Sequence, residues 1–93
     1  MPTLHTLNKA SLDHIASKDC FRALEMGDAL VLIEDGVYLT QRNKIAKKSV
    51  FIFVLQHDLH LRGLSPMQGR IQIIDDVEFV QLCAQYDKII SWF

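Results

Sequence analysis

The sequence predicts an α/β fold, a small three-layer sandwich in which helices flank a mainly parallel sheet of four to five strands. Apolar segments of strand length alternate with segments of helical periodicity along the chain. Two of the apolar runs, in residues 29–33 and 49–55, are continuous, which is typical of strands buried on both faces of a parallel sheet. The length of 93 residues allows one domain, residues 1–93, and no internal repeat or linker interrupts it.

The first half of the chain predicts a strand, a helix and a second strand. Residues 3–7 are rich in β-compatible side chains, and the following turn ends at Ser11, a good helix N-cap. Residues 12–26 form the helix, closed by Gly27, and residues 29–33 form the strand. The apolar side of the helix is predicted to contain Leu12, Ile15, Ala16, Cys20, Ala23 and Leu24.

The second half repeats this order. Residues 37–48 are predicted to form a short helix or an irregular crossover. Residues 49–55 give the strongest strand signal, and this strand should lie centrally beside residues 29–33. A helix of one or two turns follows at 58–63, then a turn at 65–66 and a strand at 71–74. Asp75 or Asp76 can cap a last helix that runs to about Tyr86, before an apolar segment at 89–93.

Four βα units in series predict parallel strands with helices on both faces of the sheet. In such sheets, ligands and partners meet the loops at the carboxyl ends of the strands. These loops are predicted at residues 8–11, 34–38, 56–58 and 75–76.

The composition excludes several classes of function. Ten Lys and Arg residues against eleven Asp and Glu give a net charge of -1 without a basic stripe, so we expect no direct nucleic-acid binding. The chain contains no apolar run long enough to cross a bilayer and no N-terminal signal pattern, so we expect a cytoplasmic protein without membrane contact. Because 49% of so short a chain is hydrophobic, apolar surface should remain for a partner.

The sequence holds no motif for nucleotide, metal or hydrolytic chemistry. Its four glycines stand alone and match no phosphate-binding loop, and no serine elbow is present. His57 and His60 could share one helical face, but a metal needs further ligands and only Asp58 is near, which favours a solvated helix. The acidic pairs at 34–35 and 75–76 are explained by capping and turn formation. We therefore expect neither a metal nor an organic cofactor.

Two cysteines remain as candidate nucleophiles, and they are too few and too isolated for a disulfide framework. Cys83 falls on the apolar arc of the last helix, which indicates a structural role. Cys20 is predicted at the margin of the first helix's apolar side, near Lys18 and Arg22, where a thiol could be reachable. Two roles stay open for Cys20: a structural one, and a carrier that accepts persulfide sulfur and passes it on.

Several segments, in this order and spacing, resemble the TusB/DsrH family of small sulfur-relay subunits. They are LHTLNK at 4–9, GDALVLIEDGVY at 27–38, DL at 58–59 with RGL at 62–64, and DVEFV at 76–80 with Trp92. The resemblance implies a subunit that assembles with TusC/DsrF-like and TusD/DsrE-like paralogues into a heterohexamer with two copies of each. Such complexes pass persulfide sulfur to a TusE/DsrC-like acceptor.

The resemblance implies 2-thiouridine formation at the tRNA wobble position in the Tus branch, and sulfur oxidation in the Dsr branch. The main sulfur-carrying cysteine of the family belongs to the TusD/DsrE-like subunit, which implies an accessory role for this chain. Cys20 falls where DsrH-type members carry a cysteine, so a sulfur carrier in sulfur oxidation is the alternative. Asp35, Gly36 and Val37 are predicted to lie nearest the partner. A third hypothesis is a stand-alone flavodoxin-like domain that binds a small ligand.

Overall fold

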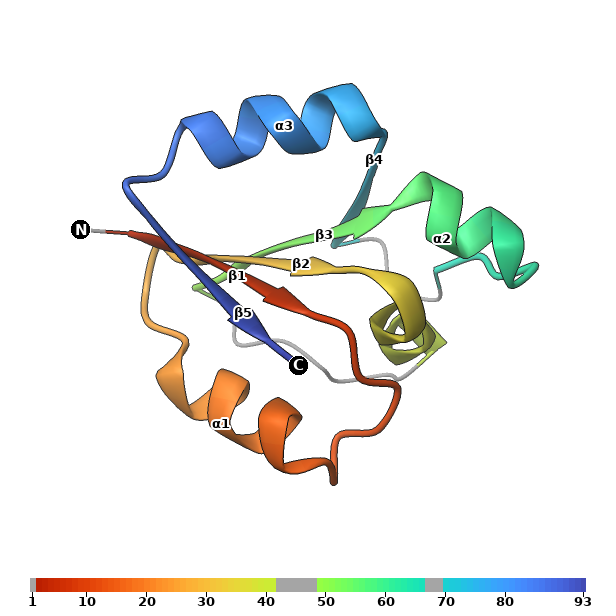
Figure 1. Ribbon diagram of the computed structural model, residues 1–93, viewed down its shortest axis with the longest axis horizontal. Helices are drawn as coiled ribbons and strands as arrows, with labels where there is room; N and C mark the ends of the chain where they lie inside the picture. The colour runs from red at the N-terminus through yellow and green to blue at the C-terminus, as the bar shows by residue number, and fades with distance from the viewer. Residues whose placement is uncertain (1, 42–48, 67–69) are drawn as a thin grey trace.

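A computed structural model describes residues 2–41, 49–66 and 70–93. The elements in chain order are β1 (Thr3–Leu7), α1 (Ile15–Ala23), β2 (Ala29–Leu32), the 3-10 helix η1 (Glu34–Gln41), β3 (Phe51–Leu55), α2 (Gln56–Leu61), β4 (Ile71–Ile74), α3 (Asp76–Ala84) and β5 (Lys88–Trp92). One five-stranded sheet has the order β4-β3-β2-β1-β5, and all neighbouring strands are parallel. Helices α1 and α3 cover opposite faces of it, as Figure 1 shows. The predicted α/β class and the parallel sheet are therefore confirmed.

The two continuous apolar runs lie inside the sheet, as predicted. All four residues of β2 are buried, because β1 and β3 flank this strand and helices or loops cover both its faces. Strand β3 lies between β2 and β4 but is less enclosed, since Phe51 at its start is 60% exposed. The final apolar segment forms β5, a fifth strand beside β1 at the sheet edge.

Alternation along each strand divides the apolar side chains between two cores. On the α1 side, the core includes Leu7, Cys20, Leu30, Ile52 and Val54. On the α3 side, the buried residues are Leu4, Ala29, Val31 and Ile74, with half-buried side chains of α3 packed against them. No residue of α3 itself is buried, so this helix lies on the sheet without being enclosed.

Helix α1 is shorter than the predicted 12–26, and its buried side differs. The helix begins at Ile15 because His14 caps it, with Nδ1 of His14 accepting a hydrogen bond from the Ala16 amide at 3.0 Å. The prediction that Ile15 faces the core is wrong, since this side chain is 66% exposed. The buried residues are instead the small side chains Ala16, Ser17 and Cys20, which allow α1 to pack closely against the sheet.

The remaining boundaries differ from the predictions by a few residues. Residues 34–41 form η1, and the other part of the predicted crossover, residues 42–48, lies outside the described residues. Helix α2 begins directly after β3, two residues before the predicted start. Helix α3 begins after Asp75 as predicted, in a capping box with Glu78, but ends at Ala84 rather than near Tyr86. No helix in the described part of the chain is long and apolar enough to cross a membrane.

Candidate functional site

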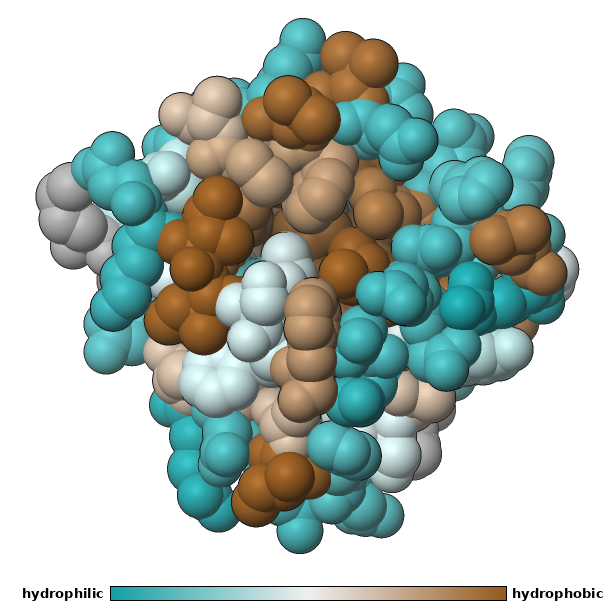
Figure 2. Space-filling view, viewed as in Figure 1, coloured by the Kyte–Doolittle hydropathy of each residue, from teal (hydrophilic) through white to brown (hydrophobic). Residues whose placement is uncertain are grey.

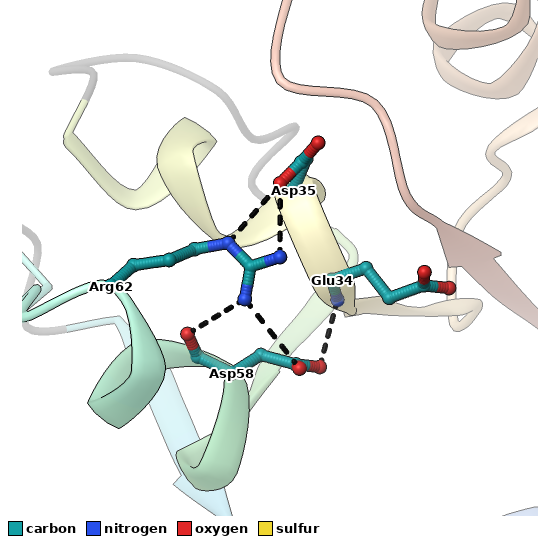
Figure 3. Close-up of polar contacts among 4 residues, drawn as sticks. All are labelled: Glu34, Asp35, Asp58 and Arg62. Atoms are coloured by element: carbon teal, nitrogen blue, oxygen red, sulfur yellow. Dashed lines mark hydrogen bonds and ion pairs between the residues drawn. The ribbon is translucent and has the colours of Figure 1, made fainter.

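The carboxyl ends of β2 and β3 carry a cluster of charged groups that we call the strand-end cluster: Glu34, Asp35, Asp58 and Arg62 (Figure 3). Glu34 is the first residue of η1 and has a positive φ of 48°, which is uncommon for a residue with a side chain. Its amide donates a 2.7 Å hydrogen bond to Oδ2 of Asp58, in the first turn of α2. The beginning of η1 is thus capped by a side chain from a different element.

Arg62 connects Asp35 and Asp58, two of the three acidic residues of the strand-end cluster. Its Nε and Nη2 donate to Oδ1 of Asp35 at 3.2 and 2.9 Å. Its Nη1 donates to the main-chain oxygen of Asp58 at 3.1 Å and lies 3.7 Å from the Oδ1 of that residue. The hydrogen bonds that Arg62 donates to Asp35 raise the pKa of Arg62 above its ordinary value. The guanidinium also lies 5.9 Å from the centre of the Tyr38 ring, in cation–π range.

The side chains of the strand-end cluster differ in exposure, and Asp35 is the most exposed of those that contact Arg62. The Asp35 side chain is 63% exposed, whereas those of Arg62 and Asp58 are 20% and 13% exposed. The Glu34 carboxylate points away from Arg62 (Figure 3). The cluster contains no thiol, hydroxyl or imidazole side chain, and its arrangement is that of a fixed loop that presents carboxylates to solvent or to a partner.

The three residues predicted to lie nearest the partner differ in accessibility. The Asp35 side chain is 63% exposed, whereas Gly36 and Val37 are buried, and the position of the three nearest a partner stays a prediction. Gly36 lies against the end of β1, where a Cβ would overlap the carbonyl oxygen of Leu7. Within η1 both residues are directed inward, and Asp35 is the most exposed of the three.

Cys20 is buried completely, at 0% exposure, in the core between α1 and the sheet. The prediction of a reachable thiol is wrong because the buried side of α1 is centred on Ala16, Ser17 and Cys20, which places Cys20 inside rather than at the margin. Burial raises the pKa of this thiol to about 12, so the nucleophilic thiolate is strongly disfavoured at neutral pH. The carrier role stays a prediction that requires the thiol to be uncovered.

Cys83 is half-buried on the core side of α3, where it packs with Phe79, Leu82 and Tyr86 against the sheet. Burial also raises the pKa of this thiol. Its environment is that of a small apolar side chain, which supports the structural role expected from its position.

His57 and His60 line a cavity of about 250 Å³ together with Gln56, Asp75 and Asp76, at the same edge of the sheet. The structure thus brings together two histidines and two acidic residues that are distant in sequence. Within residues 2–41, 49–66 and 70–93, no three His, Cys, Asp or Glu side chains lie close enough together to hold a metal ion.

A buried polar network that extends from the turn before β2, through β1, to the end of β5 was not predicted from the sequence. Asp28, just before β2, accepts hydrogen bonds from the Thr3 amide at 2.9 Å and the Glu25 amide at 3.0 Å. Nε2 of His5, which is 1% exposed, lies 3.0 Å from Oδ2 of Asp28. Trp92 Nε1 donates to Nδ1 of His5 at 3.1 Å, and the two rings stack. The network ties β1, β5 and the turn before β2 together.

Sequence signals for the strand-end cluster exist but are weak. Asp58 and Arg62 stand four residues apart, the spacing of a helical ion pair, but that spacing alone does not identify Asp35 as the second partner. Asp28 has no such signal, because its donors come from residues 3, 5 and 25 and meet only in the folded chain.

Known proteins resemble this chain along almost its whole length. A family model described as "DsrH like protein" matches residues 9–89. The Protein TusB of Pectobacterium parmentieri is 32% identical over 95 residues, which cover 96% of this chain and 99% of that protein. The Protein TusB of Salmonella arizonae is 31% identical, with coverage of 96% and 99%.

A solved structure has the same fold. The solution NMR structure of Protein Tm0979 from Thermotoga maritima superposes with a TM-score of 0.67 at 25% sequence identity, covering 91% of this chain and 95% of that one. The motifs at both ends of the chain, the parallel sheet and the family match therefore agree. The chain belongs to the DsrH-like family, the family of small sulfur-relay subunits that its sequence motifs resemble.

Proposed function

We propose that this protein is an accessory subunit of a cytoplasmic sulfur-relay complex that supplies sulfur for 2-thiouridine at the tRNA wobble position. The observation that carries the proposal is the family match over residues 9–89, with relatives named TusB of nearly equal length. The partners are TusC/DsrF-like and TusD/DsrE-like paralogues in a heterohexamer, and the acceptor is a TusE/DsrC-like protein. No metal or organic cofactor takes part in this chain's role.

The accessory role is supported by the environment of the thiols. In a sulfur relay, the acceptor thiolate attacks the outer sulfur of a persulfide, takes that sulfur, and leaves the donor as a thiolate. Cys20 is fully buried with a pKa raised to about 12, so it is poorly suited to either half of this exchange. The sulfur therefore travels on a paralogue, and this chain supports the complex.

The strand-end cluster supplies a contact in this proposal. Arg62 holds Asp35 in one position at the carboxyl edge of the sheet, with the side chain of Asp35 63% exposed. A carboxylate fixed in this way offers a basic side chain of a paralogue or acceptor a partner that needs no further ordering.

The test of the proposed function is native mass spectrometry of the tagged chain purified gently from its own cells. We expect a complex with both paralogues, in which the added mass of a sulfur atom appears on a paralogue and not on this chain. A lone monomer or homo-oligomer without sulfur would contradict the proposal and favour the small-ligand domain.

A matched pair of cysteine variants separates the accessory role from the carrier role. In cells that lack this gene, Cys20→Ser and Cys83→Ser should both restore 2-thiouridine in tRNA to the wild-type level, because neither thiol carries sulfur. Loss of 2-thiouridine with Cys20→Ser alone, in a complex that still assembles, would establish Cys20 as a carrier and reject the accessory role.

A further inference from the structure

From the structure we infer that the outer flank of α3 and the adjoining face of β5 form the docking surface for a protein subunit whose own apolar contact is bordered by basic side chains. We call this surface the α3–β5 face and define it by Val77, Val80 and Ile89 with the bordering acids Asp76 and Asp87. The inference rests on the proposed function, since it names the surface by which the chain would join its paralogues.

Helix α3 is apolar on two sides, although only one side contacts the sheet. Phe79, Leu82 and Cys83 pack on the core. Val77 and Val80 are 65% and 67% exposed, and no residue of the helix is buried. A surface helix of a monomer normally carries polar residues on the side away from its core. Two exposed valines on this side are typical of a helix that packs against a second partner.

The orientation of α3 directs Val80 toward β1 and β5. Glu78 and Gln81 line a cavity together with Gln72 and Ile74 of β4, so this flank of the helix faces the β4 edge. At 100° per residue, Val80 lies on the other flank, above the half of the sheet that contains β1 and β5. On this face Leu4 of β1 is buried, whereas Ile89 of the edge strand β5 is 47% exposed, so the exposed valine lies on the side of α3 that faces the open strand.

The sheet below this flank is also apolar and open. Ile89 of β5 is paired in register with Leu4, a residue of the core under α3, and therefore points to the same face. Its side chain is 47% exposed, whereas the opposite face of β5 is covered by α1. Figure 2 shows apolar side chains gathered on this face, from α3 across the hollow beneath it to the front of the sheet.

Charge identifies the kind of partner. Residues 71–87 contain no Lys or Arg and four acidic residues: Asp75, Asp76, Glu78 and Asp87. Of these four, Asp76 and Asp87 border the α3–β5 face, whereas Glu78 lies on the opposite flank of α3. Lys88, the next residue, pairs with Thr3 and lines a cavity on the α1 side of the sheet. The whole chain has a net charge of only -1, so the acidic charge at this surface is a local excess. It would repel nucleic acid and anionic lipid, and a protein with Lys or Arg around an apolar centre would be complementary to it.

A second copy of this chain is a poorer occupant than a paralogue. In a two-fold dimer the same patch meets itself, which would bring the acidic residues of the two copies close together. Like charges opposed at an interface disfavour association, so the same acids that attract a basic partner act against self-pairing.

The experiment compares aspartate substitutions at equally exposed apolar sites. Val80 is 67% exposed, and the matched controls Ile15 and Leu61, 66% and 68% exposed, lie outside the α3–β5 face. With the purified paralogues as the probe, Val80→Asp should weaken binding by about tenfold or more, because a charge at an apolar centre is desolvated on association. Ile15→Asp and Leu61→Asp should bind as the wild type does.

The variant Asp87→Lys is a second test of the α3–β5 face, and it leaves the sequence of α3 unchanged. It should slow association with the paralogues and reduce the dependence of the association rate on salt, because an attraction between opposite charges is removed. Thermal unfolding of all variants should stay close to that of the wild type, since each site is exposed.

Several outcomes would overturn the inference while leaving the proposed function intact. They are wild-type binding by Val80→Asp, equal weakening by the two controls, or faster association of Asp87→Lys. Self-association of the wild-type chain that Val80→Asp abolishes would assign the surface to a second copy instead. Failure of the wild-type chain to bind either paralogue would reject the proposed function itself.

Discussion

Asp28 is 4% exposed, but its carboxylate is surrounded by donors. Burial alone would raise the pKa of Asp28, and the hydrogen bonds from the Thr3 and Glu25 amides and from His5 reverse the direction, so the pKa is lowered overall. Because Trp92 donates to Nδ1 of His5, that nitrogen carries no proton and the ring donates to Asp28 from Nε2. A single buried charge is thus held directly by β1 and by the turn before β2, and β5 is joined to it through His5.

Replacing Asp28 by Asn should lower stability at neutral pH by about 1–3 kcal/mol, because buried donors lose a charged acceptor. Since the folded-state pKa of Asp28 is lowered, its contribution is present above the ordinary value of 3.8 and is lost as the pH falls through the folded-state pKa. Urea unfolding at pH 7 and in the acid range should show the difference between wild type and Asp28→Asn shrinking in acid. The exposed control Asp13→Asn should follow the wild type at both pH values.

Gly36 is required by space rather than by its backbone angles. A Cβ at this position would overlap the carbonyl oxygen of Leu7, which is main chain and also accepts a hydrogen bond from the Ile33 amide at 3.1 Å. Gly36→Ala should therefore destabilise the fold by about 1–3 kcal/mol, the range for overpacking.

Gly63→Ala is the control for Gly36→Ala. Gly63 has a φ of +62° and no atom within 4 Å of its added Cβ, so only the backbone strain of about 1–2 kcal/mol applies. Urea unfolding measures both variants. NMR amide resonances should distinguish the two variants more clearly than stability does. Gly36→Ala should shift the resonances of β1 and η1, whereas Gly63→Ala should shift only those at the end of α2. Shifts confined to η1 would contradict the proposed overlap.

At the scale of elements, η1 depends on a side chain that belongs to α2. Asp58→Ala removes the acceptor of the Glu34 amide and one partner of Arg62, so it should lower stability by about 1–2 kcal/mol, as the loss of a helix cap does. Hydrogen exchange of the Glu34 amide should accelerate in this variant. Asp58→Asn keeps a carbonyl acceptor and should retain most of the protection; equal loss in both variants would indicate that charge, not capping, holds the loop.

The elements show which part of the fold follows from local sequence. Continuous apolar runs predicted β2 and β3 inside the sheet, and the N-cap candidates Asp75 and Asp76 marked the start of α3, because both signals act over a few residues. The buried side of helix α1 was harder to predict, because it depends on how closely the helix packs against the sheet. Small side chains such as Ser17 fit there, whereas Ile15 is exposed.

The site was predictable only in part, for a related reason. The position of the loop at the carboxyl ends of the strands follows from the βα order, and Asp35 lies there. The burial of Gly36 and Cys20 depends on how η1 and α1 pack on the sheet, which no local pattern encodes. The sequence therefore indicated the edge of the sheet but not which of its residues remain accessible.

On the scale of the whole molecule, stability is concentrated in the middle of the sheet. Strand β2 is fully buried and pairs on both sides, and the apolar residues of β1 and β3 complete the two cores. Helix α3 contributes only half-buried side chains to its core. The molecule thus combines a rigid centre with one helix that is weakly held in the isolated chain.

Native-state hydrogen exchange should report this difference. Amides of β1, β2 and β3 should exchange most slowly, by global unfolding, while those of α3 should exchange faster through local opening, since few buried contacts oppose it. Binding of the paralogues should slow exchange in α3 and β5 more than in α1, because the α3–β5 face is then covered. Protection of α3 equal to that of β2 in the isolated chain would show that the helix is already fully held, and would remove the structural reason for a partner on its outer flank.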